Sequence, residues 1–418
     1  MNILSIETSC DDTSLAIIRA PAPRGRGSFN KIERRGKNQV SFDVVSSVVS
    51  SQIKIHKKWG GVYPALALRA HQKNLIPVLK KVLEKAGELQ IAPFDRLRAI
   101  PKGIELATWE RKNTTIKEIL DKEPELLNNF LRFIPKIKKP NIDAISITEG
   151  PGLEPCLWTG INLARALSFF WKMPVIPINH VKAHIFANFV KEKINLKKDS
   201  GFFPALALVV SGGHTQLILM NNFKKYKILG ETQDDAAGEC LDKVARILGL
   251  EYPGGPVIEK KAEEWQMANC KFKINLPRPM INSKNYDFSF SGLKTAVLYD
   301  FKTRSTKIKK DKNYIRQICF ETQQAIFDVL IKKTLKAAKD FRVKTLLLGG
   351  GVVSNQELKK QIKKAIKNSL PETKLMIPEP YYCTDNAVMT GINSYFNFPS
   401  GKLKHWQNLK AKANLRIE

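Results

Sequence analysis

The sequence predicts a two-lobed α/β protein in which one architectural unit occurs twice. Its 418 residues are long for a single domain and suit two lobes of about 200 residues each. Residues 3–18 (ILSIETSCDDTSLAII) and 206–220 (LALVVSGGHTQLILM) repeat one pattern, an apolar run, a short polar turn and a second apolar run. This pattern is typical of a β-hairpin, and strands alternate with helices after both stretches. The repetition favours a duplicated fold with a mostly parallel sheet in each lobe.

The elements between and after the hairpins follow from apolar periodicity. After the first hairpin we expect strands over 143–148 and 175–178, and helices over 63–86, over 157–171 and from Asn179. After the second hairpin we expect a strand over 345–348, and helices near 235–248, after Pro256, over 314–341, from Ser354 and from Thr384.

These elements suggest an N-terminal lobe at residues 1–180, a C-terminal lobe at 181–400 and a basic tail at 401–418. Two segments of the first lobe look inserted. Residues 20–39 contain PAPRGRG and are expected to form an exposed loop or hairpin tip. Residues 90–140 are polar with a helical stretch inside them, and a structureless loop of that length is uncommon in a compact domain. We therefore expect a small helical excursion there.

The composition excludes several classes of protein. Hydrophobic residues at 43% and charged residues at 26% are ordinary for a soluble chain and exclude a disordered or collagen-like one. No apolar run approaches the roughly 20 residues that span a membrane. Glu7, Asp11 and Asp12 lie where a signal peptide would need apolar residues. The six cysteines contain no C-x-x-C pair, so we expect reduced thiols and a cytoplasmic protein.

The formal net charge of +30 predicts a polyanionic partner. A lysine-rich proteome would also raise the charge, but the positive residues cluster at 19–37, 302–316 and 402–416. Nucleic acid is the first expectation. An anionic membrane surface is the second, and no long basic amphipathic helix ending in aromatic residues supports it.

A histidine pair is the first candidate for chemistry. His180 and His184 stand four residues apart in NHVKAH, which places both imidazoles on one helix face, as a metal site requires. The alternative is one core and one surface histidine. The segment is not H-E-x-x-H, because Val181 stands where a protease needs its glutamate. Asp385 is a candidate third ligand, and its alternative role is the N-cap of the last helix.

Glycine-rich turns are the second candidate. The turn at 210–214 (VSGGH) offers backbone amides and a hydroxyl to an anion, unless it is an ordinary hairpin turn. Residues 346–355 end a strand in three glycines before a helix, which favours phosphate or nucleotide binding, although neither a P-loop nor G-x-G-x-x-G is present. Acidic residues within 234–242 lie just before a helix or in its first turns. They either stabilise the positive end of the helix dipole or bind a ribose or a metal. Turns at 149–152 and 252–256 leave backbone open to a ligand.

Ten of these segments together resemble the TsaD family, the tRNA N6-adenosine threonylcarbamoyltransferases, of the bacterial type. They occur in the family's order: ETSCDDTS, GGVYPALALRAH, EGPGL, NHVKAH, VSGGHTQL, DDAAGECLDKVARILGL, YPGGP, FSFSGLKTA, GGGVVSNQEL and TDNAVMTG. The resemblance implies the two-lobed fold shared by actin, Hsp70 and sugar kinases (the ASKHA fold). It also implies transfer of threonylcarbamoyl from threonylcarbamoyl-AMP to N6 of the adenosine 3′ of the anticodon, in tRNAs that read codons starting with A. AMP is the leaving group.

The resemblance also implies roles for individual residues. His180, His184 and Asp385 match the family's ligands for one divalent metal, for which iron is our first expectation and zinc the second. We expect the imidazoles and the aspartate to come from different lobes and to meet across the cleft between them. Asp11 and Asp12 match acidic residues near the active site, with a role in proton transfer. The positions that match the adenylate site are Val209, Val210, Ser211, Gly212, Gly213, Asp242, Gly255 and Asn355.

The chain departs from the family in places. Archaeal and eukaryotic relatives have a tyrosine ligand where Val209 stands, so an open metal position is left for water or substrate. The insertions at 20–39 and 90–140 bear on how the first lobe meets its partner, because bacterial relatives pair with a TsaB-like paralogue and a TsaE-like ATPase. The basic loop and tail are expected to touch tRNA, and no membrane partner is expected.

Three other functions compete with this interpretation. A sugar or acetate kinase of the same fold would need a catalytic carboxylate beside a small-molecule pocket, and it leaves the charge of +30 unexplained. A metalloprotease is excluded by Val181. A non-catalytic paralogue is expected to lack the two histidines and Asp385, all of which are present.

Overall fold

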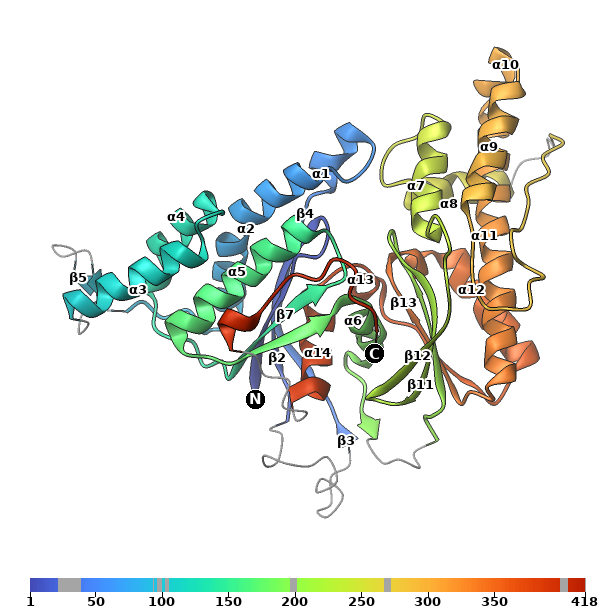
Figure 1. Ribbon diagram of the computed structural model, residues 1–418. Helices are drawn as coiled ribbons and strands as arrows, with labels where there is room; N and C mark the ends of the chain where they lie inside the picture. Colours follow the sequence, from blue (N-terminus) through green and yellow to red (C-terminus); the bar gives the residue numbers. More distant parts are fainter. Residues whose placement is uncertain are drawn as a thin grey trace. The chain divides into compact units, whose positions relative to one another are not determined.

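The computed structural model describes residues 1–21, 39–92, 94–95, 100–101, 105–195, 201–266, 272–398 and 405–417 (Figure 1). The chain forms two compact units. Unit 1 comprises Met1–Gln52, Val62–Lys197 and Asp385–Arg416, and unit 2 comprises Ile53–Gly61, Lys198–Thr384 and Ile417–Glu418. Each unit is built on one five-stranded sheet.

The two sheets have the same topology. In unit 1 the order is β4-β2-β1-β7-β8, with bounds β1 Asn2–Glu7, β2 Asp12–Arg19, β4 Asp43–Ser51, β7 Ala144–Gly150 and β8 Val175–Asn179. In unit 2 it is β12-β11-β10-β13-β14, with bounds β10 Ala205–Val210, β11 Thr215–Asn222, β12 Lys225–Glu231, β13 Thr345–Gly349 and β14 Lys374–Met376.

If the five strands of each sheet are numbered along the chain, both sheets have the same order from edge to edge: third, second, first, fourth and fifth. The first three strands pair antiparallel, and the fourth and fifth join in parallel. The predicted duplication and the ASKHA fold class are therefore confirmed. The expected mostly parallel sheet is wrong, because two of the four strand pairs in each sheet are antiparallel. Because the carboxyl ends of parallel strands open toward one edge of a sheet, the loops there are where such folds place ligands.

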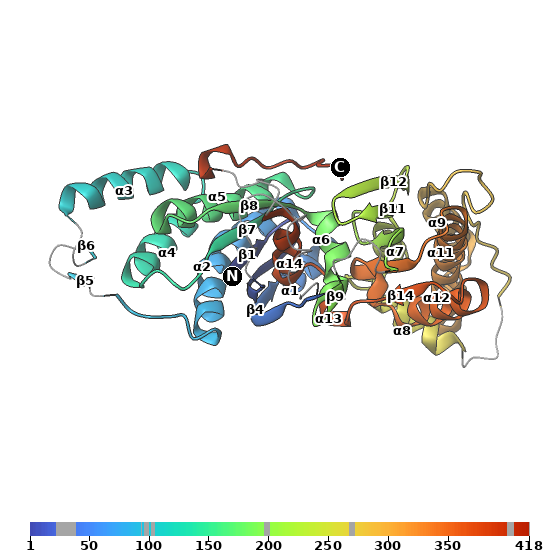
Figure 2. The same cartoon turned by 90° about the horizontal axis from the view of Figure 1, so that it is seen from below.

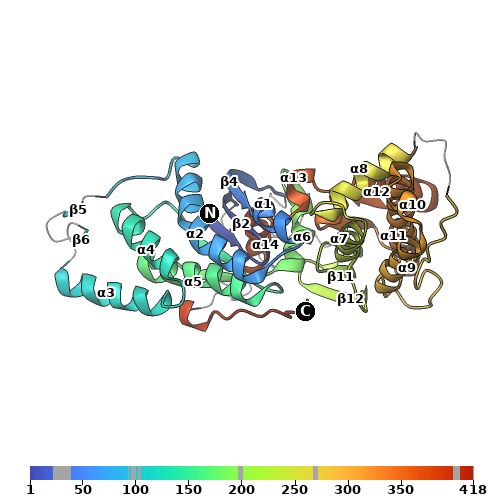
Figure 3. The ribbon, with the colours of Figure 1, turned by 90° about the horizontal axis from the view of Figure 1, so that it is seen from above.

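Helices cover both faces of the unit 1 sheet. Helices α2 (Pro64–Lys85) and α5 (Glu154–Trp171) pack together over one face, as Figures 1 and 3 show, and bury Leu4, Ile6 and their neighbours. Helix α14 (Ala387–Asn397) packs against β1 and β2 and contacts α6 (His180–Phe186). A Cβ on Gly391 would lie 2.4 Å from Ser5 Oγ, so only glycine lets α14 approach the sheet this closely.

Unit 2 has a helical layer over its own sheet. Buried residues of β10, β11 and β13 form one core with helices α7 (Ala237–Ile247), α8 (Gly254–Gln266), α9 (Ser291–Thr303), α11 (Lys312–Asp340) and α12 (Gln356–Ser369). The shorter elements are α1 (Ile53–His56), α10 (Thr306–Lys309) and α13 (Pro380–Cys383). Unit 1 adds α3 (Leu106–Ile119), α4 (Pro124–Phe133) and two small ribbons, β3 (Gln39–Val40) with β9 (Ile194–Asn195) and β5 (Phe94–Asp95) with β6 (Ile100–Pro101).

The predicted helices and strands are present, but the third strand of each sheet and the three-residue strand β14 were missed. Strand β4 is rich in serine and half-exposed, and β12 alternates lysine with apolar residues, so neither has the continuous apolar run of a buried strand. The helical excursion expected within 90–140 is present as α3 and α4. The basic segment expected at 20–39 lies largely outside the described residues, which omit 22–38.

The two compact units differ from the division predicted from the sequence, which was an N-terminal lobe at 1–180, a C-terminal lobe at 181–400 and a tail at 401–418. Helix α6 and residues 385–416 belong to unit 1, because α14 buries its apolar face against β1 and β2. A linear division cannot anticipate such a return of the chain to its first sheet. Within the described residues, no helix has the length and apolar character needed to cross a bilayer.

A half-buried ion-pair cluster joins two helices of unit 2 and predicts a pH effect. Asp235 receives hydrogen bonds from Lys243 of α7 at 2.7 Å and from Lys294 of α9 at 2.8 Å. Burial opposes ionisation of Asp235, but the two ammonium groups outweigh it and lower its pKa below the ordinary 3.8. The stabilisation is therefore present above pH 3.8 and is lost as the pH falls through the lowered pKa.

Asp235→Asn is expected to lower the free energy of unfolding by about 1–2 kcal/mol near neutral pH. Urea unfolding of both proteins at neutral pH and at a pH below 3.8 measures this effect. The difference between the two proteins should shrink in acid, and an equal difference at both pH values would contradict the ion-pair account.

Candidate metal centre and nucleotide turns

Helix α6 carries both histidines at the carboxyl end of β8. Asn179 ends that strand and caps the helix, since its Oδ1 accepts a hydrogen bond from Lys182 N at 3.0 Å. His180 and His184 follow one turn apart, with 5% and 0% of their surface exposed and ring centroids 4.7 Å apart. The alternative of one core and one surface histidine is therefore wrong.

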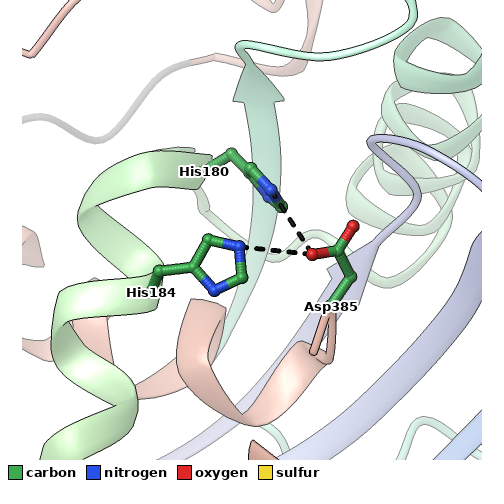
Figure 4. A group of neighbouring side chains, drawn as sticks. All are labelled: His180, His184 and Asp385. Carbon is green, nitrogen blue, oxygen red and sulfur yellow. Dashed lines mark ion pairs between the residues drawn. The ribbon is translucent and has the colours of Figure 1, made fainter. Parts of the chain in front are cut away.

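Asp385 points at the two imidazoles. Its Oδ1 lies 3.5 Å from His180 Nε2 and 3.2 Å from His184 Nε2 (Figure 4). Asn386, not Asp385, caps α14 by accepting from Met389 N at 3.1 Å, so the capping role considered for Asp385 is wrong. One ligand atom from each of the three residues lies within 4.8 Å of the others.

All three residues belong to unit 1, so the expectation that the aspartate comes from the other lobe is wrong. Asp385 is the first residue of the C-terminal segment that returns to the unit 1 sheet. Its place beside α6 follows from the packing of α14 against α6.

Glu7 is a site residue that sequence reasoning missed. Its Oε2 accepts from Thr148 Oγ1 at 2.5 Å and from Thr390 Oγ1 at 3.1 Å, and lies 3.4 Å from His180 Nδ1. Its Oε1 accepts from Ser9 N at 2.9 Å. The side chain is fully buried, and the available signal was an acid at the end of the apolar strand ILSIE.

The carboxylate of Glu7 and the hydroxyl of Ser9 fix the orientation of His180. Ser9 Oγ lies 3.1 Å from Nδ1, on the same side of the ring as Glu7. With Nδ1 engaged there, Nε2 is directed at Asp385. A carboxylate behind the ring of a histidine is the usual means of orienting a metal ligand.

Charges in this group are balanced by the protonation of His180. Burial lowers the pKa of His180, but the Asp385 and Glu7 carboxylates outweigh it and raise the pKa to about 9. Burial opposes the ionisation of Glu7, yet the neighbouring imidazolium lowers its pKa. Burial lowers the pKa of His184, so its ring is neutral near neutral pH. One positive charge thus lies between two carboxylates, and a bound cation would take over the role of that proton.

The donor set fits a divalent transition metal. Two imidazole nitrogens and a carboxylate oxygen converge, which is the donor chemistry of iron and zinc sites. His184 supports the fit, because neither of its buried ring nitrogens has a hydrogen bond of acceptable geometry within the described residues. A fully buried imidazole without such bonds is costly unless another ligand occupies it.

Asp11 and Asp12 lie at the turn between β1 and β2. Burial, together with the charges of Asp11 and Asp385, raises the pKa of Asp12 to about 7. Its Oδ1 is buried with no hydrogen-bond partner among the described residues. A carboxyl that titrates near neutrality suits a general base. Its role in proton transfer stays a prediction.

The VSGGH segment forms a closed turn in unit 2. Ser211 N donates to His214 O at 2.8 Å, and His214 N donates to Ser211 Oγ at 3.1 Å. A Cβ on Gly212 or Gly213 would meet nothing within 4 Å, so the described fold does not itself require glycine at either position. Within the described part of the chain, the amides of both glycines are without hydrogen-bond partners. The turn thus offers two open amides to an anion.

The other residues predicted to bind the adenylate differ in how much of each side chain can reach a ligand. Val209 and Val210 are fully buried in β10, so their side chains are not available to a ligand. Asp242 Oδ1 accepts from Gly254 N at 2.7 Å and so holds the YPGGP turn against α7. Asn355 caps α12 through Leu358 N at 3.0 Å and donates to Gln323 Oε1 at 2.9 Å.

These contacts support some of the predicted nucleotide-binding roles better than others. Gly255 is open, because a Cβ there would meet only the Leu241 side chain, at 4.0 Å. Asn355 has both ends of its amide engaged within the protein, which fits a residue that positions the glycine loop before it. The turn at Ser211, Gly212 and Gly213 is the part with free backbone donors.

The chain is similar to one protein family along most of its length. The family profile described as TsaD, tRNA N6-adenosine threonylcarbamoyltransferase, matches residues 43–97 and 124–392, and the stretch between these matches contains α3. Proteins named tRNA N6-adenosine threonylcarbamoyltransferase are similar over full length. That of Persephonella marina is 38% identical over 100% of this chain and 96% of its own, and that of Thermosipho africanus is 38% identical over 100% of both. That of Geobacillus kaustophilus is 35% identical over 96% of this chain and 92% of its own.

Proposed function

The chain belongs to the TsaD family of tRNA N6-adenosine threonylcarbamoyltransferases, and on that premise we propose its reaction and the residues that carry it out. The chain is an enzyme, a transferase that acts in tRNA modification. The proposed reaction moves threonylcarbamoyl from threonylcarbamoyl-AMP to N6 of the adenosine 3′ of the anticodon, in tRNAs that read codons starting with A. The new N6–C bond replaces the bond between the carbamoyl carbon and the phosphate oxygen, and AMP leaves with that oxygen.

The convergence of His180, His184 and Asp385 is the observation that carries the proposal. His180, His184 and Asp385 would hold one divalent metal, for which iron is the first expectation and zinc the second. When bound, the metal would act as a Lewis acid and stabilise negative charge that develops on the carbamoyl or phosphate oxygens. Glu7 would keep Nε2 of His180 directed at the metal.

The glycine turn of unit 2 supports the proposed binding of the adenylate. Its open amides at Gly212 and Gly213 suit the phosphate, and Asp242, which also accepts from Gly254 N, is the proposed acceptor from a ribose hydroxyl. Gly255 lets the nucleotide approach the backbone.

Asp12 is the proposed acceptor of the proton that N6 loses. Its raised pKa of about 7 lets it exist as a carboxylate and take up a proton near neutral pH. Asp11 keeps that pKa raised by charge repulsion. The net charge of +30 supports tRNA as the polyanionic substrate. We propose action in the cytoplasm with partners of the TsaB and TsaE type.

Replacing one ligand tests the metal and the activity together. His184→Ala is expected to remove the bound metal and to reduce threonylcarbamoyl transfer at least about 100-fold, since an imidazole ligand is lost. His56→Ala is the matched control, because it removes a buried imidazole that lies outside the ligand set. Metal content by mass spectrometry and transfer from threonylcarbamoyl-AMP to tRNA, with TsaB- and TsaE-like proteins added, are the measurements.

Two outcomes would contradict the proposed function. Full metal content in the His184→Ala protein would exclude the proposed ligand set. Transfer of phosphate to a sugar, with no threonylcarbamoyl product in the wild type, would favour the kinase alternative.

Gly213→Ala separates nucleotide binding from folding. The added methyl group meets open space, so the free energy of unfolding should stay the same or rise by about 0.4–1 kcal/mol. AMP binding, measured by calorimetry, should weaken about tenfold, because the methyl group obstructs an anion at the open amides. Metal content should not change, and AMP affinity equal to that of the wild type would contradict the assigned turn.

A further inference from the structure

The C-terminal segment at residues 405–416, here called the C-terminal strap, lies along unit 1. It follows α5 in Figures 1 and 2, where it is drawn in red. We propose that the strap is a positioning element of the candidate metal centre, which holds α6 and the turn before α5 in the arrangement that lets His180 and His184 bind a cation. This inference rests on the proposed metal site and assigns a role to a segment outside the ligand set.

Two side chains anchor the strap. The ring of Trp406 packs edge-on against Phe169 of α5 at 5.5 Å, and the guanidinium of Arg165 lies 5.7 Å from the Trp406 ring. Leu409 is 1% exposed and belongs to the hydrophobic core of unit 1. The first residues of the strap are therefore fixed independently of its last residues.

The strap then bonds to the turn at Glu149–Gly152, which the sequence marks as EGPG. Lys412 N donates to Glu149 O at 2.9 Å, and Gly152 N donates to Ala413 O at 3.1 Å. A Cβ on Gly150 would lie 1.9 Å from Lys412 O, so the strap occupies the space where a side chain would stand. The first glycine of this motif is thus explained by the strap and not by a ligand.

That turn leads directly to the histidines. A Cβ on Gly152 would lie 2.5 Å from Ser9 O, and Leu153 N donates to the same oxygen at 2.8 Å. Ser9 in turn places its Oγ 3.1 Å from His180 Nδ1. The strap therefore supports, through one turn, the residue that contacts the back of the first imidazole.

A second connection runs through Asn179. Its Nδ2 lies 3.3 Å from both Leu415 O and Arg416 O and donates to them, while its Oδ1 caps α6. One amide thus joins the strap to the helix that carries both histidines. Two separate connections from a core-anchored segment to one pair of ligands indicate a positioning role, which an unconnected basic tail would not have.

Removal of residues 410–418 is the direct test, because it leaves the anchors Trp406 and Leu409 in place. The affinity for Zn²⁺ alone, measured by competition with a chromophoric chelator, is expected to fall at least about tenfold, as for other groups that orient metal ligands. The control changes Lys410 and Arg416 to Gln in the full-length chain and keeps Lys412, because Lys412 Nζ lies 3.4 Å from Glu149 Oε2 in the supported turn. It removes two positive charges of the strap, keeps its backbone bonds, and should bind Zn²⁺ like the wild type.

Asn179→Asp is the second variant and needs no truncation. The new carboxylate still caps α6, but its other oxygen faces the carbonyls of Leu415 and Arg416 and repels them. Zn²⁺ affinity should fall about tenfold, although the added negative charge alone would raise it. In the truncated chain the same substitution should have little further effect, because the two changes disrupt one connection.

The outcomes separate this inference from the proposed function. Wild-type Zn²⁺ affinity in both the truncated and the Asn179→Asp proteins would overturn the role of the strap and leave the metal site standing. Zn²⁺ binding absent from the wild type itself would overturn both. Weaker binding in both variants, with the charge control unchanged, supports the strap.

Discussion

The buried carboxylate of Glu7 is the feature on which the candidate site depends. It lies at the end of the first strand, held by two threonine hydroxyls and the amide of Ser9, and it faces Nδ1 of His180. A buried carboxylate is costly unless it is paired and hydrogen-bonded, so this position demands a positive charge nearby. The protein meets that demand with an imidazole whose other nitrogen is directed at Asp385. The orientation of the ligands thus follows from the cost of burying Glu7.

The proposed function assigns each of the two duplicated units a different task. Both sheets have the same strand order, and in each sheet a polar turn joins the two strands of the first hairpin. In unit 1 that turn carries acids, Asp11 and Asp12, beside the histidines. In unit 2 it carries Gly212 and Gly213 with open amides. A turn with carboxylates suits a metal and proton transfer, whereas a turn with bare amides suits a phosphate.

The sequence predicted much of this because its signals were local. Hairpin patterns, helix periods and the spacing of His180 and His184 all lie within single elements. What could not be predicted depends on contacts between distant segments. The neighbouring Asn386 could have been recognised as a cap, but the return of Asp385 to the first sheet depends on how α14 packs. The role of Glu7 needs Thr148 and Thr390, which are far away in the chain. The edge strands β4 and β12 had too little apolar character to be seen.

X-ray absorption spectroscopy at the metal edge of the purified protein tests the central claim most directly, because it reports the ligand atoms of the bound ion. The account predicts one ion per chain, coordinated by two imidazole nitrogens and at least one carboxylate oxygen. Any ion that the His180→Ala protein retains should show the signal of at most one imidazole ring. An ion bound by oxygen ligands alone, or a spectrum unchanged by that substitution, would contradict it.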